Sequence, residues 1–323
     1  MTTACSEQLT LWDLGSQQVT VDFQGGCLVS DAGLLAIRSL DKELGVLARL
    51  AERLPDPRAQ KFVVHSREAL LTQQVYQILA GYADCNDAQL LRHDPLFQTV
   101  VDVSPTVEQP LASGSTLARF QHAFTRRQAE QPPEEREVLR EVDAAQSQRL
   151  KILNDYLPEL FIRTRRQVPA ALTIDLDASD DPTHGQQILT GFHGYFDQHQ
   201  YFPLFAFDGD TGLAADRWAF HRFRANALKL LEHTLAYALV VLHREATAAI
   251  AEVDRAEVAT LRSRLWTVAA VVKTSVRRIW FHFSATWPYR NLWLRVEHAL
   301  RQFVADVHAA ARAGPSVAAT LPM

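Results

Sequence analysis

Apolar residues recur at three- and four-residue intervals along most of this sequence, a pattern that predicts amphipathic helices. Polar residues such as Ser30 and Asp31 precede several of these segments, where they can cap a helix N-terminus. We therefore expect the two ends of the chain to be mainly helical. The segments that predict helices are 31–47, 68–82, 87–92, 117–127, 134–157, 223–244, 257–265 and 292–311.

A different pattern, apolar runs and alternation with period two, predicts strands in the middle of the chain. The run 170–174 reads as a buried strand, and the aromatic-rich segments 191–196 and 201–207 follow it. A turn sequence comes directly after the last of them. We expect these three strands to form an antiparallel meander, with shorter strands at 17–24 and 275–283.

Composition narrows the class of protein. The chain has 323 residues, of which 47% are hydrophobic, and its net charge is −4, so contacts with nucleic acid must come from local basic patches. The three cysteines show no Cys-x-x-Cys spacing, so neither a zinc site nor a disulfide framework is indicated. No secretory signal is recognisable, and the longest apolar stretch is too short to cross a bilayer. We expect a cytoplasmic protein without a membrane partner.

The acidic segment after residue 174 carries the clearest chemistry. Asp175, Asp177, Asp180 and Asp181 fall within seven positions at the predicted strand end. Crowded carboxylates repel one another unless a cation binds them, and hard oxygen ligands suit Mg²⁺ or Mn²⁺. This predicts a metal site that uses Asp177, Asp175 and Asp180.

Two other interpretations of the same segment stay open on local grounds. An exposed acidic turn closed by Asp181-Pro182 would explain the composition equally well. The run from Asp175 to Ser179 also resembles the D-x-D-x-[ST] start of haloacid-dehalogenase-like phosphohydrolases. That fold requires alternating β and α units after the motif, and the predicted meander disfavours it.

Two basic segments are candidates for DNA contact. The helix over 117–127 follows a turn, and its polar side chains could reach base edges while its arginines contact phosphates. Arg277 and Arg278 lie among aromatic residues in the strand predicted near the C-terminus. The alternative for 117–127 is a capped surface helix without DNA contact. The alternative for the segment with Arg277 and Arg278 is a structural strand. The candidate DNA-binding residues of the helix are Ser115, Thr116, Arg119, Gln121, Arg126 and Arg127.

The acidic segment belongs to a longer motif with a family resemblance. The run Asp175-x-Asp177-x-x-Asp180-Asp181-Pro-Thr-His-Gly-x-Gln187 resembles the start of the catalytic domain of bacterial insertion-sequence DDE transposases. Weaker similarities extend over most of the chain, among them Leu91-Arg-His-Asp-Pro-Leu-Phe97 and His221-Arg-Phe-x-Ala-Asn226.

The resemblance implies an RNase H-like core and two-metal cleavage and strand transfer at the terminal inverted repeats of a mobile element. In that family three carboxylates hold the metals, one on the first strand, one on a later parallel strand and one on a helix. The first-strand acid corresponds here to Asp177, with Asp175 as the second choice. A homodimer or an association with a full-length transposase is the expected partnership.

The sequence departs from that family after Leu213. The turn at 208–213 runs almost at once into the segment beginning at Ala214, and a parallel crossover needs a dozen or more residues. We interpret this as an internal deletion that removed the second Asp and the Glu. Such a protein would be inactive alone, and a non-catalytic DNA-binding or inhibitory remnant is the alternative. The other nearby acids, none of which matches a family motif, are Asp208, Asp210, Asp216 and Glu232.

Together these observations predict an α+β protein with a partial RNase H-like core, in which a three-stranded antiparallel meander forms an incomplete sheet. We expect a mostly helical N-terminal, DNA-binding region at 1–165 and the start of the catalytic core at 166–213. A helical C-terminal region should cover 214–312, and a disordered tail 313–323.

Overall fold

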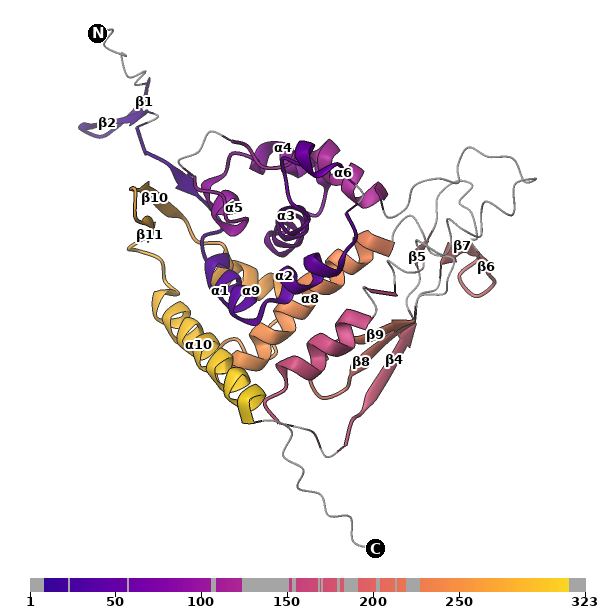
Figure 1. Ribbon diagram of the computed structural model, residues 1–323. Coiled ribbons are helices and arrows are strands. Elements are labelled where there is room, and N and C mark those ends of the chain that lie inside the picture. Colours follow the sequence, from indigo (N-terminus) through magenta and orange to yellow (C-terminus); the bar gives the residue numbers. More distant parts are fainter. Residues whose placement is uncertain are drawn as a thin grey trace, which may run out of the picture.

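The protein has an α+β architecture, and its described residues form a group of helices together with four small antiparallel sheets (Figure 1). No helix among the residues that the computed structural model describes is long and apolar enough to cross a membrane. The described residues are 9–22, 24–56, 58–105, 109–123, 151–152, 155–167, 169, 171–178, 181–182, 191–201, 204–212, 214–218 and 227–313.

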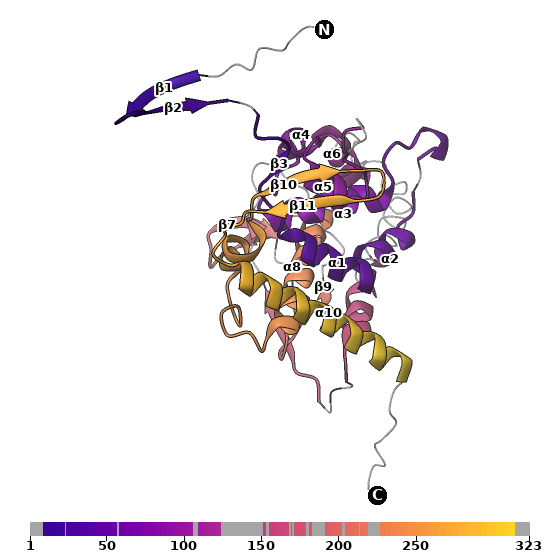
Figure 2. The ribbon, with the colours of Figure 1, turned by 90° about the vertical axis from the view of Figure 1, so that its left-hand side faces the viewer.

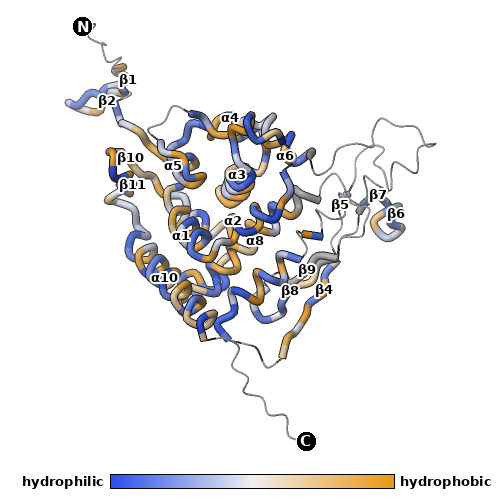
Figure 3. The backbone as a smooth tube through the Cα atoms, in the orientation of Figure 1, coloured by the Kyte–Doolittle hydropathy of each residue, from blue (hydrophilic) through white to orange (hydrophobic). Residues whose placement is uncertain are grey.

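The helical region surrounds α3, which contacts α2, α5 and α8 (Figure 1). The helix α10 packs across α1 and α8 and exposes hydrophilic residues on its outer side (Figure 3). Apolar side chains of these helices form one continuous core. The bounds of these helices are α1 Leu34–Leu44, α2 Val46–Arg53, α3 Arg67–Ala80, α5 Pro95–Val100, α8 Ala227–Thr247 and α10 Arg290–Ala313.

Local signals in the sequence set several of these bounds. Gly45 adopts a left-handed conformation (φ 61°), which ends α1 and separates it from α2, so the single helix predicted over 31–47 is two. The Ser66 side chain accepts a hydrogen bond from the Ala69 amide and begins α3. Asp94 caps α5 with Pro95 in its first turn, a helix that the sequence reading missed.

The remaining helical segments are short. A 3₁₀ turn at Cys85–Asp87 leads into α4 (Ala88–Leu91), and α6 (Gly114–Ala123) covers the start of the predicted DNA-reading helix. Residues 155–164 are helical, whereas most of the helix predicted at 134–157 lies outside the described residues. The helix α9 (Val258–Leu261) continues as a π-helical turn through Trp266.

Two of the sheets contain the strands formed by the N-terminal residues 9–29. The hairpin of β1 (Leu9–Leu14) and β2 (Gln17–Val21) projects away from the body (Figure 2). A second sheet has the order β11-β10-β3 and comprises β3 (Leu28–Val29), β10 (Ala270–Thr274) and β11 (Ile279–Phe283).

The other two sheets contain the acidic segment, and they correct the predicted meander. One has the order β4-β8-β9, and the other has the order β5-β7-β6. The segment 191–196 therefore does not lie between the first and last predicted strands, because it pairs within its own sheet. The bounds are β4 Ile174–Ala178, β5 Asp181–Pro182, β6 Gly191–His193, β7 Gln198–Tyr201, β8 Leu204–Asp208 and β9 Ala214–Trp218.

A buried ionic group ties the first three helices together. The Asp41 carboxylate accepts hydrogen bonds from the Arg38 guanidinium, from the Leu47 amide of α2 at 3.0 Å and from the Tyr76 hydroxyl of α3 at 3.3 Å. Burial raises the pKa of this carboxyl, and the nearby Arg38 opposes that effect. Because Asp41 is only 1% exposed, its loss would leave Arg38 buried with less compensation.

We expect Asp41→Ala to lower the free energy of unfolding by roughly 3 kcal/mol, because it breaks a buried charge pair and removes the acceptor of the Leu47 amide. Lys42→Ala is the matched control. Lys42 also pairs with an aspartate, Asp102, but its side chain is 51% exposed, so its loss should cost less than about 1 kcal/mol. Urea denaturation measures both values, and equal losses would contradict the assigned role of Asp41.

Candidate functional site

The strand β4 brings two of the predicted acids together. Asp175 and Asp177 lie within the strand rather than beyond its end, which corrects the strand bounds expected from sequence. Asp175 stands opposite Phe207 and Asp177 opposite Phe205 in the register with β8. Because side chains alternate along a strand, the two carboxylates project from the same face, and both residues are exposed.

The turn between β8 and β9 begins at Gly209, directly beside Thr173 and Asp175. The Gly209 amide donates a 2.8 Å hydrogen bond to the Thr173 carbonyl oxygen. A Cβ atom at Gly209 would come within 3.1 Å of the Asp175 Oδ2 atom and within 2.9 Å of the Thr173 Cγ2 atom. Glycine at this position therefore allows the turn to approach Asp175 closely, a feature that the sequence reading did not identify.

Asp208 lies in the same sheet but has a different environment. It stands opposite Ile174, so it projects from the face opposite to Asp175 and Asp177, and it is only 2% exposed. Its Oδ2 atom accepts hydrogen bonds from the Thr211 amide (3.2 Å) and hydroxyl (2.5 Å). Asp208 is therefore the buried last residue of β8, where sequence predicted a turn residue, and its carboxylate holds the turn that follows.

An arginine connects that turn to the long helix α8. The Arg165 Nη2 atom lies 3.7 Å from the Asp208 carboxylate and 3.8 Å from that of Glu245, and it donates a hydrogen bond to the Thr211 hydroxyl. Burial raises the pKa of Glu245, while Arg165 and Arg166 act to lower it. Asp208 and Glu245 are thus held by arginine, away from the face of Asp175 and Asp177.

The other acids considered from sequence do not join Asp177. Glu232 of α8 is fully buried in the helical region and accepts a 2.7 Å hydrogen bond from Gln121 of α6. Asp216 lies in β9 opposite Ala206, and its side chain is outside the described part of the structure, as is that of Asp181. Asp180 itself falls outside the described residues.

The described donor set does not fit a two-metal centre. Among the residues that the structure describes, no three His, Cys, Asp or Glu side chains are grouped so that they could hold a metal ion. Within the described part of the chain, no third acid from a helix or a neighbouring strand joins Asp175 and Asp177 on their face. Two metals about 4 Å apart require more ligands than this pair supplies, so no cleavage step follows from these residues.

The helix α6 presents part of the predicted DNA-reading set. Ser115 and Arg119 are exposed, and the Arg119 Nη2 atom donates a 3.2 Å hydrogen bond to the Thr116 hydroxyl. Gln121 instead turns inward, where it bonds Glu232 and lies 3.5 Å from the Cys85 thiol. The Gln121 side chain therefore anchors α6 to α8 instead of facing outward toward DNA. Arg126 and Arg127 lie outside the described residues.

The second basic segment forms a hairpin tip rather than part of a strand. The amides of Arg277 and Arg278 donate hydrogen bonds to the Ser275 hydroxyl, and the Ser275 amide donates to the Arg278 carbonyl. The strand predicted from 275 therefore begins only at Ile279. Both arginines are exposed, and their hairpin lies across the helical region from β4 (Figure 1).

The comparison with known families defines the class of this protein. The family model described as transposase DDE domain group 1 matches residues 13–213 and 210–305. Because these matches cover most of the chain, the protein belongs to the DDE transposases of that group. The two matching segments meet at residues 210–213, in the turn between β8 and β9. No curated protein and no solved structure matches the chain.

The buried and the exposed aspartates should respond differently to substitution. We expect Asp208→Ala to lower the free energy of unfolding by about 2 kcal/mol, because Thr211 and Arg165 lose a buried acceptor. Asp175→Ala should change it by less than about 0.5 kcal/mol, since an exposed carboxylate beside Asp177 contributes little. Urea unfolding, monitored by tryptophan fluorescence, measures the free energy of unfolding of both variants. A larger loss for Asp175→Ala would contradict these assignments.

Proposed function

We propose that this protein descends from an insertion-sequence transposase and keeps DNA binding while its catalytic centre is incomplete. One observation carries the proposal: the chain passes from the end of β8 to the start of β9 through residues 209–213 alone. A parallel crossover needs a dozen or more residues. The strand and helix that hold the second and third acids of the family have no room at that point.

Two further observations support an internal deletion. No described strand pairs with the edge of β4 that faces away from β8, which is where an RNase H-like core would place its next strand. The family model also matches in two segments that meet at 210–213, as expected if a stretch of the family's domain is missing between them. The sequence alone predicts this junction near Leu213 and Ala214.

The proposed metal chemistry is correspondingly limited. Any Mg²⁺ or Mn²⁺ that this protein binds would be held by Asp177 and Asp175, with Asp180 as a further candidate. Carboxylates suit these cations, but a pair from one strand supplies too few ligands to position two of them. The residues present therefore favour a protein that cannot cleave DNA by itself.

The DNA-binding part of the proposal rests on two separate basic features. Ser115, Thr116 and Arg119 lie on the exposed first turns of α6, where a reading helix contacts bases and phosphates, and Arg126 and Arg127 follow them along the chain. Arg277 and Arg278 form an exposed hairpin tip. We propose that these groups bind the terminal inverted repeats of the element.

The partner follows from the same reasoning. A chain that binds element ends without cutting them would compete with, or join, an intact transposase at those ends. We propose a homodimer or a mixed assembly with a full-length relative in the cytoplasm. In that assembly the intact subunit would supply the acids that this chain lacks.

Binding to labelled inverted-repeat duplexes tests the DNA-binding half. We expect Arg277→Ala/Arg278→Ala to weaken binding and to lower the slope of log K against log salt by about 2, because two phosphate contacts disappear. Arg301→Ala/Arg312→Ala on α10 is the matched control with the same change in charge, and it should bind like the wild type. An unchanged salt slope in the first variant would contradict the assignment of Arg277 and Arg278.

The same duplexes, end-labelled and incubated with Mn²⁺, test the catalytic half. The protein alone should produce no nick at the element end. Addition of an intact relative should restore nicking, and excess of this protein should change its rate. Nicking by the purified protein alone that disappears in Asp177→Asn would contradict the proposal.

A further inference from the structure

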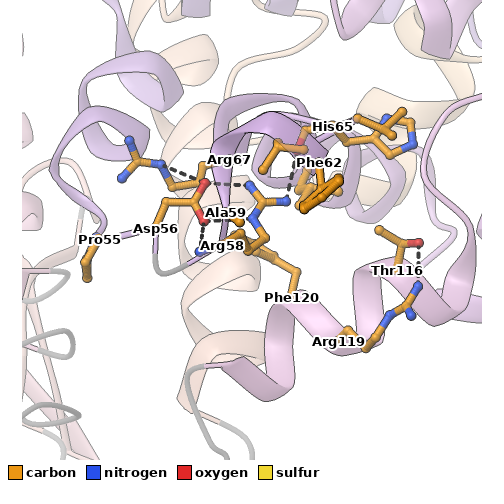
Figure 4. A pocket seen from close by; sticks show the side chains of 13 residues that line it. Pro55, Asp56, Arg58, Ala59, Phe62, His65, Arg67, Thr116, Arg119 and Phe120 are labelled. Carbon is orange, nitrogen blue, oxygen red and sulfur yellow. Dashed lines mark hydrogen bonds and ion pairs between the residues drawn. The ribbon is translucent and has the colours of Figure 1, made fainter.

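A cavity of about 630 Å³ lies between the connection from α2 to α3 and the exposed side of α6 (Figure 4). Its volume falls within the range of small-ligand pockets. Residues from 55 to 70 form one wall, and Thr116, Arg119 and Phe120 form the other. The cavity therefore adjoins the same turns of α6 that we propose to face DNA.

The first wall is held in place by a local ion pair. The Arg58 guanidinium donates two 2.7 Å hydrogen bonds to the Asp56 carboxylate, and its Nη1 atom donates to the His65 carbonyl at 3.0 Å (Figure 4). Arg67 lies 3.8 Å from the same carboxylate. These contacts fix the course of the connection on both sides of the 3₁₀ turn Gln60–Phe62, so the cavity is preformed.

Three flat rings, those of Phe62, His65 and Phe120, line the cavity. Phe62 is 75% exposed although it is a large apolar side chain, and His65 lies beside it (Figure 4). Burial lowers the pKa of His65, with Arg92 and Arg58 acting in the same direction, so its ring is neutral near pH 7. Phe120 lies opposite on α6 and is nearly buried. Exposed rings of this kind form stacking surfaces for nucleic-acid bases.

The charge around the rings is positive. Three arginines, Arg58, Arg67 and Arg119, line the cavity, and Asp56 is the acid among the lining residues. The Lys61 ammonium also lies over one face of the Phe62 ring, 4.8 Å from its centre, which leaves the other face for stacking. An apolar stacking surface with cations at its margin is complementary to a group that joins a flat ring to a phosphate.

We propose that this cavity binds an unpaired, unstacked nucleotide of DNA. Its base would stack on Phe62 and His65, and its phosphate would be bound by Arg119 and Lys61. The inference deepens the proposed function and rests on it, because α6 must lie against DNA for such a nucleotide to reach the cavity. A paired base in a continuous duplex could not enter, since its faces are covered by its neighbours.

Two duplexes of the same inverted-repeat sequence test the proposal, one fully paired and one carrying a single extrahelical 2-aminopurine. We expect the wild type to bind the second duplex about tenfold more tightly and to quench the 2-aminopurine fluorescence by stacking. Phe62→Ala should abolish both the preference and the quenching while its affinity for the paired duplex stays within twofold. Phe192→Ala, another exposed phenylalanine on β6, is the matched control and should retain both.

The outcomes separate this inference from the proposed function. Equal affinity for the two duplexes overturns the inference alone and would favour an apolar side chain of a protein partner as the occupant. A preference that survives Phe62→Ala also overturns it. Absence of binding to either duplex contradicts the proposed function and removes the basis of the inference. Unchanged far-UV circular dichroism and melting temperature establish that Phe62→Ala is folded.

Discussion

Among the strands that the structure describes, β4, which carries Asp175 and Asp177, has a hydrogen-bonded neighbour on one side only. β8 pairs with one edge of β4, and none of the described strands pairs with the other. The apolar side chains of Leu172, Ile174 and Leu176 remain between 47% and 63% exposed along this segment. In a complete sheet a further strand would satisfy the open edge and cover such side chains. The proposed loss of catalysis depends on this missing neighbour.

The helical region explains how the chain can keep a core despite an incomplete sheet. The buried apolar residues come mainly from α1, α3, α8 and α10. Among the described side chains of β4 and β8, Ala206 is buried and Phe207 is partly buried against the core. Arg165 joins that sheet to α8 through Asp208 and Glu245. Removing strands from the sheet would therefore expose an edge without dismantling the core. The open edge would lower solubility, because it can pair with a strand of another chain.

Much of the helical architecture could be predicted because its signals are local. Helical periodicity located the segments of α1, α3, α8 and α10 to within a few residues, since each buries one face against the same core. The helix α5 escapes prediction because Asp94-Pro95 is typical of a helix end, whereas here it also begins the next helix. The apolar run 170–174 predicts a buried strand that starts too early, because β4 is an exposed strand over Ile174–Ala178.

The candidate sites show where sequence reasoning fails. The shared face of Asp175 and Asp177 follows from their spacing of two. The inward turn of Gln121 could not be predicted, because its partner Glu232 is 111 positions away. The cavity beside α6 is equally non-local, since its two walls come from separate segments that only the packed structure brings together.

Manganese binding to the purified protein tests the central claim most directly. Calorimetric titration with Mn²⁺, supported by electron paramagnetic resonance, counts the ions bound per chain. An unfinished acidic centre predicts at most one weakly held ion, and Asp177→Asn should weaken its binding further, because Asp177 is one of its two proposed ligands. Two ions bound per chain, both lost in Asp177→Asn, would show that further acids complete the centre and would contradict this account.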